Sequence, residues 1–297
     1  MNKRTHQSRG ELRRILRCGL FAAATAFGSD AVAQTPDVVR KAPAQPRPAA
    51  QPVAPRLARR SLPVGPQPTA IDAIRMAEAS LQAMRQIADY SCTLVKRERI
   101  DGRLTGNERL AIKLRHEPFS VYVNYLAPAK VRGQEAVYVH GHNDNRLLAH
   151  PNGLKGRLVG VFRLDPEGRM AMQGNRYPVT DLGIKRMAES WLKEAKHDVQ
   201  FVHCTTRIIP DAKIEGRPCT CLELARHTRH DGVPYQMTRL YIDAQMQLPV
   251  RYEAYEWPAI HGEEPDLAEE YTYLNIQPNR QFSDLDFDVQ NPEYEFH

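Results

Sequence analysis

The sequence of 297 residues predicts an α+β fold, in which one mostly antiparallel sheet is accompanied by two helices. After residue 69, apolar residues first recur every three or four positions, which is typical of a helix, and then every second position, which is typical of strands. Short turn-forming stretches such as Asp101-Gly102 separate successive strand segments. Because such stretches need only hairpin connections, they favour antiparallel pairing within a single domain.

The first predicted element is a helix over Ile71–Ala88, which Thr69 can cap. Its apolar residues fall three or four positions apart and would form one stripe on one face of the helix. The members of this stripe are Ile71, Ile74, Ala77, Leu81, Met84 and Ala88.

Strands follow the helix, beginning with the alternation of Tyr90, Cys92 and Leu94. In Phe119–Leu126 the alternate residues are wholly apolar, yet Tyr122 and Leu126 stand on the opposite face, so both faces need a cover. Further strands are expected over Leu104–Leu114, Gln134–His142, Arg146–His150, Val199–Ile208, Arg217–His227, Tyr235–Asp243, Leu248–Trp257 and Ala268–Ile276.

The stretch Gly141–Gly183 interrupts this pattern and contains seven of the 17 glycines. A long irregular segment inside a compact domain is usually functional or mobile. Its apolar residues predict either a flap over an apolar surface or a well-packed structural loop, and the sequence leaves both interpretations open. A second helix is predicted directly after it, over Asp181–Lys196.

The N-terminal residues predict export. A basic start, the apolar run 18–27 and Ala31-Val32-Ala33 have the order of a cleavable signal peptide over residues 1–33. Residues 34–68 hold nine of the 22 prolines, which predicts an extended, disordered spacer. Residues 69–297 would then form the folded domain, and the mature protein would lie in the periplasm or cell envelope without being an integral membrane protein.

The net charge of +6 is unevenly distributed along the chain. Residues 1–33 carry +4, residues 34–68 carry +5, and the predicted domain carries −3. A nucleic-acid-binding domain needs a basic footprint of its own. The charge distribution therefore argues against nucleic acid as a partner.

Motifs of known catalytic classes are missing from the sequence. No serine stands in G-x-S-x-G, and His116-Glu117-Pro118 does not continue to H-E-x-x-H. Glu269 and Glu270 would point to opposite faces of a strand, which weakens a role as paired acid and base. We therefore predict no catalytic residues and no cofactor.

Two clusters could bind a metal ion. His140 and His142, with His150 nearby, share a strand face but lack further ligands close by. The stronger candidates are Cys219, Cys221, His227 and His230. Buried or disulfide-linked cysteines are the favoured interpretation, because zinc sites usually draw paired ligands from turns. The pairing of Cys92, Cys204, Cys219 and Cys221 stays open, since the strand register is not fixed by the sequence.

Six motifs resemble an uncharacterised family of secreted bacterial proteins, domain-of-unknown-function family 1571. They are Ile87–Arg99, His116–Ser120, Lys130–Glu135, Asp165–Gly168, Gly174–Pro178 and Leu248–Tyr255. The resemblance covers Ile71 to the C-terminus and implies no particular activity.

More distantly, the order of elements, with Tyr241–Asp243, Leu248-Pro249 and a closing Phe282 and Phe287, resembles the LolA/LolB/RseB-like envelope proteins. That resemblance implies a single curved antiparallel half-barrel, with helices over its concave face and an apolar cavity for acyl chains.

The predicted function is non-catalytic binding of an apolar ligand, a lipid or lipoprotein acyl chain, or of an envelope protein partner. The cavity should hold few charged groups and lie under a lid made by Ile71–Ala88 and part of Gly153–Arg176. Its expected lining is Phe119, Val121, Val123, Tyr125, Leu81, Met84, Leu158 and Phe162. The alternative is a metal- or cysteine-dependent envelope enzyme that uses Cys219, Cys221, His227 and His230.

Overall fold

The computed structural model describes residues 69–153, 160–260 and 262–296, which belong to one compact unit, Pro66–His297. The predicted signal peptide (1–33), the predicted spacer (34–68) and Leu158 lie outside the described residues. Among the described helices, none is long and apolar enough to cross a membrane.

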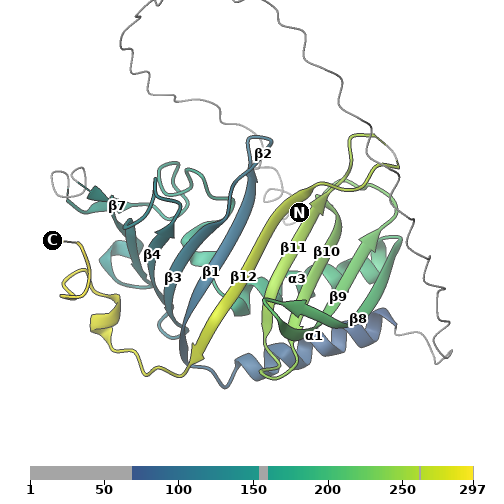
Figure 1. Ribbon diagram of the computed structural model, residues 1–297, viewed down its shortest axis with the longest axis horizontal. Helices are drawn as coiled ribbons and strands as arrows, with labels where there is room; N and C mark the ends of the chain where they lie inside the picture. Colours follow the sequence, from purple (N-terminus) through teal and green to yellow (C-terminus); the bar gives the residue numbers. More distant parts are fainter. Residues whose placement is uncertain (1–68, 154–159, 261, 297) are drawn as a thin grey trace, which may run out of the picture. The chain divides into compact units, whose positions relative to one another are not determined.

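A twelve-stranded antiparallel sheet dominates the described part of the chain, as predicted (Figure 1). Its strands are β1 (Asp89–Ile100), β2 (Arg103–Leu104), β3 (Glu108–Arg115), β4 (Ser120–Ala127), β5 (Glu135–Val139), β6 (Leu147–His150), β7 (Phe162–Leu164), β8 (Cys204–Ile214), β9 (Arg217–Arg226), β10 (Tyr235–Asp243), β11 (Pro249–Glu256) and β12 (Leu267–Pro278). The strand order is β7-β6-β5-β4-β3-β1-β12-β11-β10-β9-β8, and β2 pairs with β1.

This order follows from two runs of hairpins that meet in the middle of the sheet. Strands β1 to β7 lead outward to one edge, the chain crosses to the opposite edge, and β8 to β12 lead back until β12 pairs with β1. The crossover consists of an irregular segment and a helix, α3 (Ile184–Phe201). The segment after β7, together with α3, thus carries the chain across one face of the sheet, which is called the helix face below.

Helix α1 (Ala70–Met84) begins at Thr69, whose side chain and that of Asp72 form a reciprocal capping box. The helix ends four residues earlier than predicted, since the Ala88 N–H donates to Asn279 Oδ1 as the chain turns into β1. The predicted apolar stripe is correct only in part: Ala77 and Met84 are buried, whereas Ile71 is 56% exposed. The buried residues are mostly small, which lets α1 approach α3 closely; they are Ala73, Ala77, Ser80 and Met84.

Helix α3 begins later and ends later than predicted. Residues 179–181 form a short 3-10 turn, and Gly183 precedes the helix with a φ of 124°, a value that side-chain-bearing residues rarely adopt. The helix continues to Phe201, so the strand predicted from Val199 begins only at Cys204. Trp191, 1% exposed, anchors α3 in a core cluster with Leu222, Leu224 and Leu240.

The outer face of the sheet, opposite the helices, is covered over β4 and β5 by the C-terminal residues 282–296. Tyr294 stacks on Tyr122 with ring centroids 3.9 Å apart, and both belong to a buried cluster with Phe287 and Phe296. Buried Glu135 accepts hydrogen bonds from the Tyr122 hydroxyl at 2.6 Å and from the Glu295 N–H at 2.7 Å. This segment, and not the glycine-rich insertion, covers the second apolar face predicted for β4.

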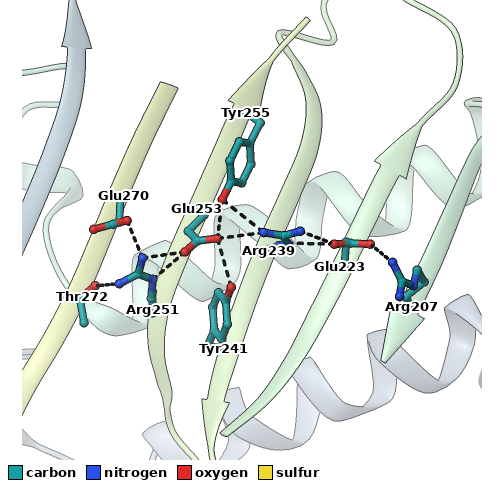
Figure 2. Close-up of polar contacts among 9 residues, drawn as sticks. All are labelled: Arg207, Glu223, Arg239, Tyr241, Arg251, Glu253, Tyr255, Glu270 and Thr272. Atoms are coloured by element: carbon teal, nitrogen blue, oxygen red, sulfur yellow. Dashed lines mark hydrogen bonds and ion pairs between the residues drawn. The ribbon is translucent and has the colours of Figure 1, made fainter. Parts of the chain in front are cut away.

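Over β8 to β12 the outer face carries alternating arginines and glutamates (Figure 2). Glu223 lies between Arg207 at 3.2 Å and Arg239 at 2.8 Å. Glu253 lies between Arg239 at 3.6 Å and Arg251 at 2.7 Å. Since each of these carboxylates has a cation on both sides, this part of the outer face stays polar without an unpaired buried charge.

Candidate ligand cavity

A cavity of about 380 Å³ lies between the helix face of the sheet and the segment that precedes and begins α3. Sheet residues form its floor, and residues 171–182, here called the lid, form its roof together with the first turns of α3. The sheet contributes Leu94, Lys96, Glu98, Leu110, Val123, Tyr125, Ala136, Leu147, Tyr252, Glu269, Tyr271 and Tyr273. The lid and α3 contribute Ala171, Asn175, Tyr177, Pro178, Val179, Asp181, Leu182, Arg186, Met187, Glu189, Ser190 and Glu194.

One end of the cavity is apolar. Leu94 pairs with Leu110 across β1 and β3, and Val123 pairs with Ala136 across β4 and β5. Residues directly opposite each other in an antiparallel pair project to the same face, so these side chains form a continuous apolar wall. Val179, Leu182 and Met187 close the wall from the lid and α3.

The other end is polar, beginning with Lys96 and Glu98 on β1. Lys96 Nζ lies 2.9 Å from Glu98 Oε2, 3.3 Å from Glu108 Oε2 and 2.7 Å from Asn175 Oδ1. The Tyr271 hydroxyl donates to Glu98 Oε1 at 2.5 Å. Burial disfavours the lysine charge, but the adjacent Glu98 and Glu108 carboxylates outweigh burial and raise the pKa of Lys96.

Glu269 on β12 completes the polar end and is 1% exposed. Its Oε1 accepts a hydrogen bond from the Tyr177 hydroxyl at 2.9 Å. Arg176 Nε lies 2.8 Å from Oε2, but without hydrogen-bond geometry, so Oε2 has an ion-pair partner and accepts no hydrogen bond. Burial raises the pKa of Glu269 to about 7, and the nearby Arg176 guanidinium offsets only part of that effect.

The lid is tied to the floor through these same polar groups. Asn175 contacts Lys96, Arg176 donates to the backbone carbonyl of Arg99 at 2.9 Å, and Tyr177 contacts Glu269. Three successive lid residues thus each reach the sheet. Helix α1 contributes no side chain to the cavity lining, which corrects the prediction that it forms part of the lid.

The predicted lining residues are only partly brought together. Val123 and Tyr125 line the cavity, whereas Val121 and Met84 are packed in the core. The others lie elsewhere: Phe119 at a separate hollow beside Arg186, Leu81 on α1, Phe162 on the edge strand β7, and Leu158 outside the described residues. The expectation of few charged groups is also wrong, because Lys96, Glu98 and Glu269 form the floor.

Sequence reasoning missed these floor residues, although strand alternation contained the information. Lys96 and Glu98 continue the series Tyr90, Cys92, Leu94 along one face of β1. Glu269 is likewise in phase with Tyr271 and Tyr273 on β12. Charged residues at buried positions of a strand are the pattern that identifies this floor.

The cysteine and histidine candidates do not converge. Cys219 and Cys221 are buried on β9, and the described cysteines are free thiols. A register shift between Ile209 and Ala212 places Cys204 opposite Arg226 and not opposite Cys221 or His227. Among the described residues, no group of three or more His, Cys, Asp or Glu side chains is arranged to hold a metal ion.

The thiols also lack the environment of reactive cysteines. Burial raises the pKa of Cys221 to about 12 and raises the pKa of Cys219. Since the thiolate is the nucleophile and the metal ligand, this environment opposes the cysteine-dependent alternative. In the other candidate cluster, His150 is buried against Phe296, whereas His140 and His142 are exposed.

Comparison with known proteins identifies one family match. The family described as "Protein of unknown function (DUF1571)" matches residues 87–296. No curated protein matches the sequence.

Several solved structures are similar. A crystal structure of MucB is 17% identical, with a TM-score of 0.42, and covers 73% of this chain. This chain spans 62% of that MucB chain. The Mycobacterium tuberculosis lipoprotein LppX is 10% identical, with a TM-score of 0.41, covering 70% of this chain and 97% of its own. A LolA superfamily protein from Nitrosomonas europaea is 15% identical, with a TM-score of 0.30, covering 71% and 97% respectively.

Proposed function

We propose that this chain, which belongs to the DUF1571 family, is a binding protein of the bacterial cell envelope that holds an amphipathic ligand. The observation that carries the proposal is the cavity of about 380 Å³, with an apolar wall at one end and a polar floor at the other. A concave, mostly apolar site with a few convergent polar groups is the usual form of a small-molecule site.

The apolar end of the cavity suits the tail of such a ligand, and the polar end suits its head group. An alkyl or acyl chain would lie against Leu94, Leu110 and Val123, where contact removes apolar surface from water. The head group would lie at Lys96, Glu98 and Glu269, where polar atoms can replace its water contacts. This assignment modifies the fully apolar ligand predicted from the sequence.

The location in the envelope rests on the predicted signal peptide and spacer of residues 1–68. Cleavage at the predicted site would release a protein that begins near Gln34. Sequencing the N-terminus of the protein purified from a bacterial periplasmic extract tests this. An intact N-terminus in the cytoplasmic fraction would contradict export.

The ligand is tested by filling the cavity. Ala136 lines the apolar wall, whereas Ala111 on β3 stands on the outer face and serves as the matched control. We expect Ala136→Phe to lose the lipid that copurifies with the wild-type protein, while Ala111→Phe retains it. Native mass spectrometry and lipid extraction measure both. Wild-type protein without any bound amphiphile, or lipid retained in Ala136→Phe, would contradict the proposal.

A further inference from the structure

We infer that the polar end of the cavity recognises an ammonium head group, so that the ligand is a cationic amphiphile such as a long-chain amine or an acylated molecule with a free amino group. This inference rests on the proposed function and specifies the ligand class of the same site. Three observations support it: which hydrogen-bond donors and acceptors at the polar end are already used, the charges of the lining residues, and the aromatic side chains of the lining.

The N–H donors at the polar end of the cavity are already used. Lys96 has three N–H donors, and Glu98, Glu108 and Asn175 lie within reach of them. The Asn175 amide donates to the carbonyls of Ala171 and Gln173. No donor of Lys96 or Asn175 is therefore left for a carboxylate or phosphate head.

Acceptors, by contrast, remain available. The Tyr271 hydroxyl donates its single hydrogen to Glu98, which leaves its oxygen as an acceptor. The Tyr177 hydroxyl donates to Glu269, and its oxygen lies 3.3 Å from the Tyr235 hydroxyl. Glu269 Oε2 is buried in the cavity wall and accepts no hydrogen bond. Arg176 Nε lies 2.8 Å from this oxygen as an ion-pair partner, but without hydrogen-bond geometry. A head group with several N–H donors and no acceptors fits this floor.

The charge of the lining points the same way. It contains two basic and five acidic side chains: Lys96 and Arg186, against Glu98, Asp181, Glu189, Glu194 and Glu269. Arg186 is engaged with Phe119, whose ring centroid lies 5.0 Å from the guanidinium carbon. Cations outside the lining pair with three of these acids: Arg176 with Glu269, Arg226 with Glu194 and Lys185 with Glu189. An anionic head would still lie beside the buried Glu98 and Glu269 carboxylates, which costs free energy.

Five tyrosines complete the lining: Tyr125, Tyr177, Tyr252, Tyr271 and Tyr273. Aromatic faces attract cations, with a larger effect in a desolvated site. Tyr177 from the lid and Tyr271 from the floor have ring centroids 6.3 Å apart, and their hydroxyls contact Glu269 and Glu98 respectively. The site thus combines carboxylates and aromatic rings, the two groups that bind ammonium ions in proteins.

Probes with one tail and different heads test the inference. We would measure the binding of dodecylamine, dodecanoate and dodecanol below their aggregation concentrations to the delipidated full chain at neutral pH, by calorimetry. Dodecylamine should bind about tenfold more tightly than dodecanoate, which corresponds to about 1.4 kcal/mol. Ala136→Phe should lose the binding of all three probes, which separates the cavity from surface attraction by the acidic domain.

Glu269→Gln should lower the preference for dodecylamine over dodecanoate about tenfold. Glu270→Gln, on the opposite face of the same strand, should leave the preference unchanged. If Glu269→Gln does not fold, as judged by circular dichroism, Glu98→Gln gives the same test. Dodecanoate binding as tightly as dodecylamine would overturn the ammonium inference alone. A chain that binds none of the probes would overturn the proposed function as well.

Discussion

Replacing Glu269 with glutamine should remove a large part of the pH dependence of the stability of the ligand-free protein. Burial raises the pKa of Glu269 from 4.5 to about 7. The folded protein therefore binds this proton more tightly than the unfolded chain does. The resulting stabilisation is fully present below the unfolded value and is lost as pH rises through the folded value.

The magnitude follows from the two pKa values. Between 4.5 and about 7, each pH unit changes the free energy of unfolding by about 1.4 kcal/mol, so the loss is about 3 kcal/mol. Glu269 is almost fully buried, so solvent screening reduces this figure little. A loss of about 3 kcal/mol is a large fraction of the stability of a typical domain.

Urea denaturation at about pH 5 and pH 8 measures the effect. The amide that replaces the carboxylate would place N–H groups near Arg176, but that cost is the same at both pH values and cancels when they are compared. Because the change is already under way at pH 5, the wild-type protein should lose about 2.5 kcal/mol more stability between the two conditions than Glu269→Gln loses. Glu270→Gln is the matched control and should retain the wild-type difference, since it leaves the buried carboxylate in place.

Other charged and titratable groups face Glu269 from the elements packed around it. They are Glu98 on β1, Arg176 and Tyr177 on the lid, Glu194 on α3, Tyr235 on β10, Tyr252 on β11 and Tyr271 on β12. Because these groups are present in all three proteins, the comparison isolates Glu269. Parallel stability profiles for the wild-type protein and Glu269→Gln would refute the reasoning.

Three further predictions concern the scaffold. Gly183→Ala should lower the free energy of unfolding by about 2 kcal/mol or more, because an added Cβ would lie 2.8 Å from Leu114 Cδ1 and φ is 124°; an unchanged urea midpoint would contradict this. Tyr294→Ala should cost about 3 kcal/mol by removing the ring that covers Tyr122, and an intact urea midpoint would show that the C-terminal segment does not stabilise the outer face. The Cys221 thiol should stay unreactive toward a thiol reagent at pH 8 until the protein unfolds, because burial raises its pKa to about 12; rapid labelling of the folded protein would contradict this.

The antiparallel sheet could be predicted because hairpins are local. Asp101-Gly102 and Glu215-Gly216 form turns between strands that are adjacent in sequence, and both pairs contain positive-φ residues. The pairing of β1 with β12 joins segments about 180 residues apart, and no local pattern specifies it. For the same reason, the contacts of Arg176 and Tyr177 with Glu269 could not be deduced from spacing.

The apolar stripe of α1 and the lining of the cavity were predicted only in part, for a different reason. Sequence patterns treat large apolar residues as buried and charged residues as exposed. In α1 the large apolar Ile71 is exposed, whereas the small residues Ala73 and Ala77 are buried where α1 packs against α3. On β1 the same rule fails for the charged residues Lys96 and Glu98, because they form an ion pair inside the cavity. Both errors therefore arise from tertiary contacts that outweigh the local preference of a residue.

Glu269 and its neighbour Glu270 show most clearly which of these exceptions concerns function. Both carboxylates stand on β12, one on each face. Glu270 lies 2.5 Å from Arg251, in a ladder where the buried carboxylates lie between cations (Figure 2). Glu269 lies in a more deeply buried place, yet one of its oxygens has no hydrogen bond and its pKa is raised. On the outer face, by contrast, Glu223 and Glu253 each have a cation on both sides. A buried acceptor that has an ion-pair partner but no hydrogen bond weakens the free protein, and a donor supplied by a ligand would recover that free energy on binding.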